Sequence, residues 1–174
     1  MSLNAIIQQH GKQITLGKGE HVFNQGDEHQ SLYYVNSGLL KAYYLSPEGK
    51  ETIKSFLTPS NIIGSLNAAY EGKPCSFNLV TLEAATLTQF SFEILQQAAA
   101  ESHAHATQLI NVLLSLSMKK EQREYEFLML PAEQRFLNFK NRDPELYNKL
   151  TQNDVAKYLG ITPVALSRIK NRKA

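Results

Sequence analysis

The sequence predicts an α+β fold in which an N-terminal β-roll precedes one long helix and a C-terminal helix-turn-helix. From about residue 13 to residue 92, short apolar runs rich in Tyr, Val, Ile, Thr and Phe are broken by glycines, as in rolls and sandwiches. After Phe92 the strand patterns stop and helix-forming residues dominate. The last 25 residues, Leu150 to Ala174, carry two short helical patterns separated by a glycine.

The composition indicates a globular protein with a real core. With 174 residues, 43% hydrophobic and 20% charged, the chain has room for one ordinary domain and a smaller second one. No apolar run approaches the ~18 residues of a membrane helix, and the first residues lack the pattern of a signal peptide. The single cysteine, Cys75, allows neither an internal disulfide nor a four-thiolate iron–sulfur cluster. We therefore expect a cytoplasmic protein.

Residues 1–104 are predicted to form the β-roll, a jelly-roll-like sensor domain with flanking helices. A short amphipathic helix should lead into it, because Leu3, Ile6 and Ile7 fall on one helical face. The stretch from Ser46 to Gly49 reads Ser-Pro-Glu-Gly, in which Pro presets φ and Gly accepts a positive φ. These residues predict a hairpin turn between two strands.

Residues 105–130 are predicted to form one long helix. Its apolar residues follow a 4-3-4-3 spacing, interrupted by Lys120 and Arg123. Two interpretations fit: the helix lies on its own β-domain, or it pairs with its twin in a homodimer. About 25 residues is long for a helix of so small a domain, which favours the dimer. The predicted dimer seam consists of Leu109, Leu113, Leu116, Phe127 and Leu130.

Residues 131–174 are predicted to form the helix-turn-helix domain. Thr151 followed by Asp154 resembles the cap of a first helix, and Gly160 supplies a left-handed turn. Thr162 can cap a second helix with Pro163 at its first position. The apolar positions expected to pack the two helices together are Val155, Leu159, Ile161, Leu166 and Ile169, with the small Ala156 at their crossing. A plain helical hairpin is the alternative.

Charge is distributed in a way that favours DNA as the partner of this tail. Residues 150–174 contain five Lys or Arg against one Asp, whereas the preceding residues have a small acidic excess. We expect Arg168 to bind guanine in the major groove and the basic residues near the helix end to meet phosphates. The candidate DNA-binding residues are Thr151, Gln152, Thr162, Val164, Ala165, Ser167, Arg168, Lys170, Arg172 and Lys173.

Taken together, these elements resemble the cyclic-AMP receptor protein/FNR-type (Crp/Fnr) family of bacterial transcription regulators. The stretch FNQGDEHQSLYYVNSGLLKAYYLSPEGKETIKSFL is similar to the family's cyclic-nucleotide-binding type of roll, with Gly26, Gly38, Gly49 and Gly64 at its turns. GITPVALSRIK is similar to its recognition helix, and Ser167-Arg168 matches the Ser-Arg pair of the FNR-type branch. The resemblance implies a homodimeric regulator of double-stranded DNA, with RNA polymerase and a small-molecule effector as further candidate partners.

Three departures from the family pattern change these expectations. Val164 replaces the usual Glu of the recognition helix, so the family's usual operator is not implied. The family also follows this helix with a β-hairpin wing, whereas the sequence ends at Ala174, as in a trimmed branch. The third departure is in the ligand cassette, which matches Gly64, Ser65, Leu66, Cys75 and Ser76.

In nucleotide-binding members a Glu of this cassette holds the ribose and an Arg holds the cyclic phosphate. Here Ser65 stands at the Glu position and Cys75 at the Arg position, so a bound phosphate would be an unpaired buried charge. We therefore predict no binding of cyclic AMP and no cofactor. The family's haem-sensing branch has a His two residues after its Cys, where this chain has Phe77, so Cys75 is expected to be a small buried thiol.

The five histidines have no tight metal-ligand spacing, and His103 and His105, two apart on a helix, point in different directions. No metal site is predicted. An enzyme is also not expected, because no nucleophile lies in a recognisable elbow or phosphate loop. The alternative function from another class is a small-molecule-binding or protein-binding β-roll whose C-terminal helices do not bind DNA.

Overall fold

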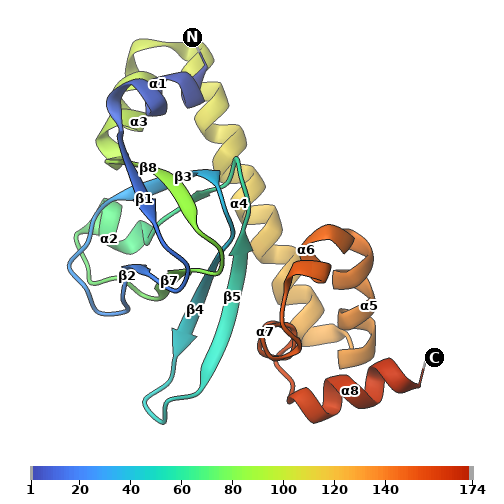
Figure 1. The fold of residues 1–174 in the computed structure, drawn as a ribbon. Helices are drawn as coiled ribbons and strands as arrows, with labels where there is room; N and C mark the ends of the chain where they lie inside the picture. The colour runs from blue at the N-terminus through green and yellow to red at the C-terminus, as the bar shows by residue number, and fades with distance from the viewer. Residues whose placement is uncertain (1, 173–174) are drawn as a thin grey trace. The chain divides into compact units, whose positions relative to one another are not determined.

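The computed structural model describes residues 2–172, and its N-terminal part is the predicted roll (Figure 1). Two four-stranded antiparallel sheets form it, with strand orders β1-β8-β3-β6 and β2-β7-β4-β5. The strands are β1 (Lys12–Leu16), β2 (His21–Phe23), β3 (Leu32–Ser37), β4 (Leu40–Leu45), β5 (Glu51–Leu57), β6 (Ile62–Ile63), β7 (Asn78–Thr81) and β8 (Ala85–Phe90). Strands distant in sequence pair across each sheet, as β1 does with β8.

The predicted hairpin turn is confirmed between β4 and β5. The Ser46 N–H donates to the Lys50 carbonyl at 3.0 Å, and the Gly49 N–H donates to the Ser46 carbonyl at 2.9 Å. Gly49 has a φ of 79°, a conformation that a side chain would make costly. The turn therefore forms through Ser46 and Gly49, two of the residues from which it was predicted.

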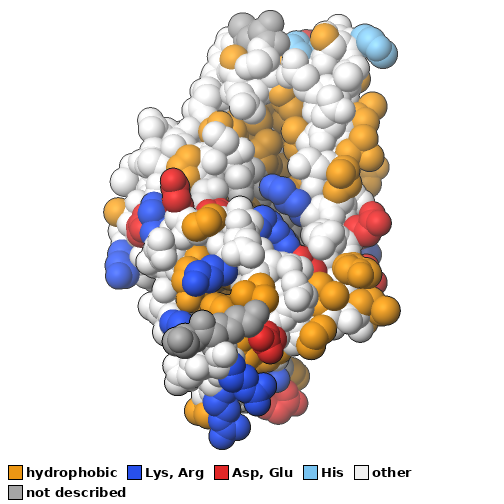
Figure 2. All heavy atoms as spheres, turned by 90° about the vertical axis from the view of Figure 1, so that its right-hand side faces the viewer, with side chains coloured by type: hydrophobic (Ala, Val, Ile, Leu, Met, Phe, Trp, Pro, Cys, Tyr) orange, Lys and Arg blue, Asp and Glu red, His pale blue; other side chains and the backbone are white. Residues whose placement is uncertain are grey.

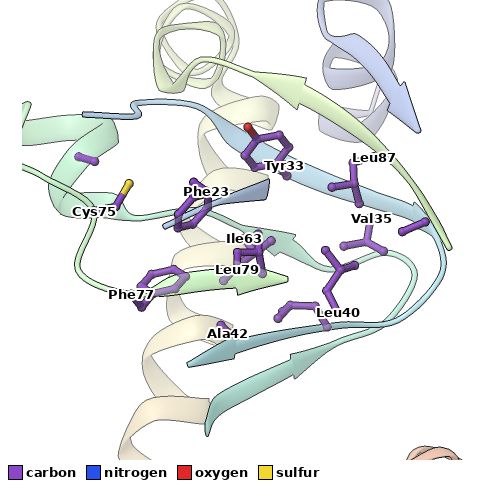
Figure 3. Packing of buried hydrophobic residues seen from close by; sticks show 13 residues of the cluster. Phe23, Tyr33, Val35, Leu40, Ala42, Ile63, Cys75, Phe77, Leu79 and Leu87 are labelled. Carbon is purple, nitrogen blue, oxygen red and sulfur yellow. The ribbon is translucent and has the colours of Figure 1, made fainter. Parts of the chain in front are cut away.

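The inner faces of the two sheets enclose the core of the roll (Figure 3). Side chains from both sheets meet there, including Val35 and Leu87 from one and Leu40 and Leu79 from the other. All four are buried, as the inward positions of alternating strands should be.

A second apolar cluster lies between the roll and its helices. The predicted leading helix is confirmed as α1 (Leu3–His10), which buries Leu3 and Ile7. It packs with α3 (Phe92–Glu101), and Leu109 and Val112 of the long helix α4 (His103–Met129) contact the same cluster. A short helix, α2 (Leu66–Glu71), follows β6.

The chain divides into two compact units, one ending at Leu113 and the other beginning at Leu114. The predicted domain boundaries at residues 104/105 and 130/131 lie within two residues of the ends of α4, but the two units divide inside this helix. The first half of α4 packs with α1 and α3, whereas its second half packs with the C-terminal helices. Within residues 2–172, no helix combines the length and apolarity that crossing a membrane requires.

The C-terminal unit is helical. After α4 it contains α5 (Ala132–Arg142), α6 (Pro144–Lys149), α7 (Gln152–Leu159) and α8 (Pro163–Asn171). Pro131 is the N-cap residue that precedes the first turn of α5. The Asp143 carboxylate accepts the Leu146 N–H at 3.0 Å and caps α6.

Candidate nucleic-acid interface

The two last helices have the caps that the sequence predicts. The Thr151 hydroxyl oxygen accepts the Asp154 N–H at 3.1 Å and begins α7. Gly160 ends α7 with a φ of 69°, in the left-handed region. The Thr162 hydroxyl accepts the Ala165 N–H at 3.2 Å and begins α8, with Pro163 in its first turn. The helix-turn-helix geometry is thus confirmed.

A compact apolar contact holds α7 and α8 together. Val155 and Ala156 of α7 and Leu166 of α8 have no exposed surface. Leu159 and Ile169 are also buried, whereas Ile161 in the turn is half-buried. Ala156 fits the close helix crossing because its side chain is a single methyl group. This packing fixes which face of α8 points outward.

The outward face of α8 combines cations with an apolar contact point. Val164 is 62% exposed, and Ser167, Arg168 and Arg172 are exposed along the same helix. Arg can bind guanine O6 and N7, and an apolar side chain can meet a thymine methyl. Figure 2 shows Lys and Arg side chains gathered near this part of the C-terminal unit. The geometry suits insertion of α8 into a major groove.

The remaining predicted contact residues have mixed placements. Lys170 Nζ donates to Gln152 Oε1 at 3.0 Å, and this hydrogen bond connects α8 with α7. Ala165 is half-buried, and the hydroxyls of Thr151 and Thr162 are used as helix caps. Lys173 lies outside the described residues.

The residues of the predicted dimer seam differ in their exposure within one chain. Leu109 packs into the apolar cluster of α1 and α3. The ring of Phe127 lies against the turn at Gly160, since a Cβ on that glycine would be 2.8 Å from the ring. Leu116 and Leu130 are half-buried, whereas Leu113 is 39% and Phe127 36% exposed. Two of the five seam residues, Leu109 and Phe127, thus contact other elements of the chain, and the dimer seam stays a prediction.

A different face of α4 is exposed and apolar. Five exposed apolar residues follow one another at intervals of three, four or seven positions, so they lie in one stripe along the helix. Among them, Leu114 is 54% and Met118 66% exposed. Figure 2 shows apolar side chains along this helix. The outer stripe, as we name it, consists of Ile110, Leu114, Met118, Tyr125 and Leu128.

The ligand cassette is closed by contacts within the roll. Ser65 is buried and its hydroxyl accepts the Ser76 N–H at 3.4 Å, so that N–H is directed at a side chain of the same chain. The Cys75 thiol is buried and donates to the His29 carbonyl at 3.2 Å. Burial raises the pKa of Cys75, which keeps the thiol neutral. Gly64 lies tightly against Leu32, and Leu66 begins α2 at the surface.

Beside this cassette lies an aromatic stack that the sequence pattern does not predict. The ring of His29 stacks on Phe23 and on Tyr33, with 5.7 Å between centroids in both pairs. The Tyr33 hydroxyl and His29 Nε2 share a hydrogen bond of 2.5 Å. Burial raises the pKa of Tyr33 to about 12 and lowers that of His29. Figure 3 shows Phe23, Phe77 and Cys75 at one end of the roll interior.

The described part of the chain contains no group of three or more His, Cys, Asp or Glu side chains placed to hold a metal ion. His103 and His105 lie in the first turn of α4. The cassette itself offers a neutral hydroxyl and a neutral thiol at the two positions where a cyclic nucleotide needs a ribose acceptor and a cation.

A β-roll, a long helix and a helix-turn-helix with a basic outward face define a class of protein that joins a sensor-type domain to a DNA-binding one. Comparison with known families agrees, since the family model described as "Cyclic nucleotide-binding domain" matches residues 13–102. The chain belongs to the Crp/Fnr family of bacterial transcription regulators.

Relatives of known function support this assignment, and a solved structure shares the fold. The chain is 32% identical to "Transcriptional activator protein Anr" of Pseudomonas protegens over 170 residues, covering 90% of this chain and 68% of that protein. It is 29% identical to "Anaerobic regulatory protein" of Haemophilus influenzae, covering 89% and 64%. The chain thus spans about two thirds of these relatives' lengths. The fold matches FixK2 from Bradyrhizobium japonicum with a TM-score of 0.79 at 18% identity, covering 93% of this chain and 83% of that one.

Proposed function

We propose that this protein is a homodimeric, sequence-specific DNA-binding transcription regulator that acts in the cytoplasm without cyclic AMP. The observation that carries the proposal is the outward face of α8, where Val164, Ser167, Arg168 and Arg172 are exposed over a fully packed helix-turn-helix. The names of its relatives, an activator and a regulatory protein, support a regulator and not an enzyme. RNA polymerase is the further partner that such a role implies.

The DNA-binding proposal can be tested with the purified protein and a random duplex library. Rounds of selection should enrich a two-part site whose halves lie roughly 34 Å apart. Fluorescence anisotropy on that site should then show affinity that falls linearly with salt on logarithmic axes. The Arg168→Glu/Arg172→Glu variant should keep the fold but no longer bind the selected DNA. Failure to enrich any sequence, with no salt-dependent binding, would favour the β-roll binding module instead.

We also expect that cyclic AMP and cyclic GMP do not bind at micromolar concentrations. The cassette presents Ser65 and Cys75, whose neutral side chains leave a cyclic phosphate without the cation that its burial demands. Isothermal calorimetry on the full chain should give only heats of dilution.

Saturable heat at low-micromolar nucleotide would contradict this prediction and would require another cation. Lys73 is the nearest candidate in sequence, although its ammonium already pairs with Glu71 at 2.6 Å on the surface. Lys73→Ala would then show whether this side chain supplies the charge, and Lys50→Ala, an exposed lysine of the β4–β5 turn, would be the matched control.

A further inference from the structure

Two arginines from different helices hold the C-terminal end of α7. Arg123 of α4 donates from Nη2 to the Tyr158 carbonyl at 2.9 Å. Arg135 of α5 donates from Nη2 to the Leu159 carbonyl at 3.0 Å. Carbonyls in the last turn of a helix lack intrahelical partners and form the negative end of its dipole. Both guanidinium groups therefore donate to partly negative carbonyl oxygens at the end of α7, immediately before the turn at Gly160.

An aromatic ring lies between the two arginines. The Phe127 ring centroid is 4.6 Å from Arg123 Cζ and 4.8 Å from Arg135 Cζ. Arg123 Cζ also lies 3.9 Å from the Tyr158 ring centroid, so this guanidinium contacts an aromatic ring of α4 and another of α7. The turn rests on Phe127 so closely that a Cβ on Gly160 would come within 2.8 Å of the ring.

The same face of α4 is tied to α5 by further polar contacts. Arg135 Nη1 donates to the Leu130 carbonyl at 3.1 Å, which fixes the end of the long helix. Glu126 is buried and forms an ion pair with Arg142, while Gln122 Nε2 donates to Glu126 Oε1 at 3.1 Å. Burial lowers the pKa of Arg123, and its contacts with Tyr158 oppose this shift.

We propose that Arg123, Phe127 and Arg135 form an arginine clasp that positions the recognition helix α8 for reading bases. The inference rests on the proposed DNA-binding function, and the clasp residues need not touch DNA themselves. Base-edge contacts demand placement within about 0.5 Å and 10–20°, whereas charge attraction to phosphates tolerates small rotations. Loosening the clasp therefore affects sequence reading more than general affinity for DNA.

The test compares specific with random duplexes. Arg123→Met removes the charge and the donors but keeps the length of the side chain. It should lower affinity for the selected site roughly tenfold, as one misread base pair does, and leave affinity for random DNA within about twofold. Arg123→Lys should restore part of the loss. Lys120→Met removes the same charge from an exposed position of the same helix and should change neither affinity.

Arg135→Lys is the second variant, because a lysine cannot donate to the Leu130 and Leu159 carbonyls in the same fixed geometry. It should reproduce the selective loss while circular dichroism shows an intact fold. Equal losses on specific and random duplexes, or no loss with either variant, would overturn the clasp.

Hydrogen exchange gives a readout that needs no DNA. The N–H groups of Gly160 and Ile161 both donate to the Ala156 carbonyl, so their protection reports on the turn. In Arg123→Met these amides should exchange roughly tenfold faster, with β-roll amides unchanged. Unchanged exchange at the turn would overturn the clasp, whether or not the protein binds DNA. Failure of the wild-type protein to bind DNA would count against the proposed function and not against the clasp.

Discussion

Replacing Leu114 and Met118 by Glu is expected to convert the protein from a dimer to a monomer. Both side chains are large, apolar and more than half exposed in the outer stripe of α4, and a helix face of this kind is stable in water when a second copy covers it. Two carboxylates per helix would face their equivalents across the two-fold axis. Sedimentation velocity should show the change directly.

Loss of the dimer should also weaken binding to the two-part site by roughly 100-fold, because linked half-sites gain that much from effective concentration. The control is Ser115→Glu with Lys119→Ala, which changes the net charge equally at exposed positions one residue further along the helix. This control should remain dimeric. If both double variants sediment like the wild type, the outer stripe is not the dimer interface.

Arg168→Ala is expected to relax base preference at one position of each half-site, costing about 1–3 kcal/mol there. Arg168 lies one turn after Val164 on the outward face of α8, where the helix is expected to approach the groove floor. Arg172 follows one turn later, at the helix end, where phosphates are nearer. Arg172→Ala should therefore weaken binding to all sequences similarly and reduce the salt slope by roughly one unit.

The two arginine variants are matched, since each removes one exposed cation from the same face of the same helix. Site selection and anisotropy at two salt concentrations measure base preference and salt slope together. Altered base preference in Arg172→Ala combined with unchanged preference in Arg168→Ala would show that α8 enters the groove in another orientation.

The helix-turn-helix could be predicted because its determinants are local. Thr151, Gly160 and Thr162 act on backbone groups no more than four residues away, and the structure places all three in the predicted roles. The turn at Gly49 was predictable for the same reason. The roll was predictable as a class, because alternating apolar runs indicate strands, although not which strands pair across the two sheets.

The aromatic stack of His29 and the arginine clasp were not predictable in this way. His29 and Phe23 belong to one stretch, but Phe77 joins them only because β2 pairs with β7. In the sequence, Arg123 interrupts an apolar seam. It lies on the inward face of α4, where its partners Tyr158 and Phe127 come from α7 and from the next turn of α4.

By itself, the sequence determined the α+β class, the long helix and the helix-turn-helix. Each depends on residue types and on spacings of a few residues, and such local patterns set the backbone conformation without any contact distant in sequence. The tertiary structure alone decided which face of α4 is free. Leu109 and Leu114 are equally apolar and both fit a helical repeat, but the packing of α1 and α3 partly buries Leu109 and leaves Leu114 exposed.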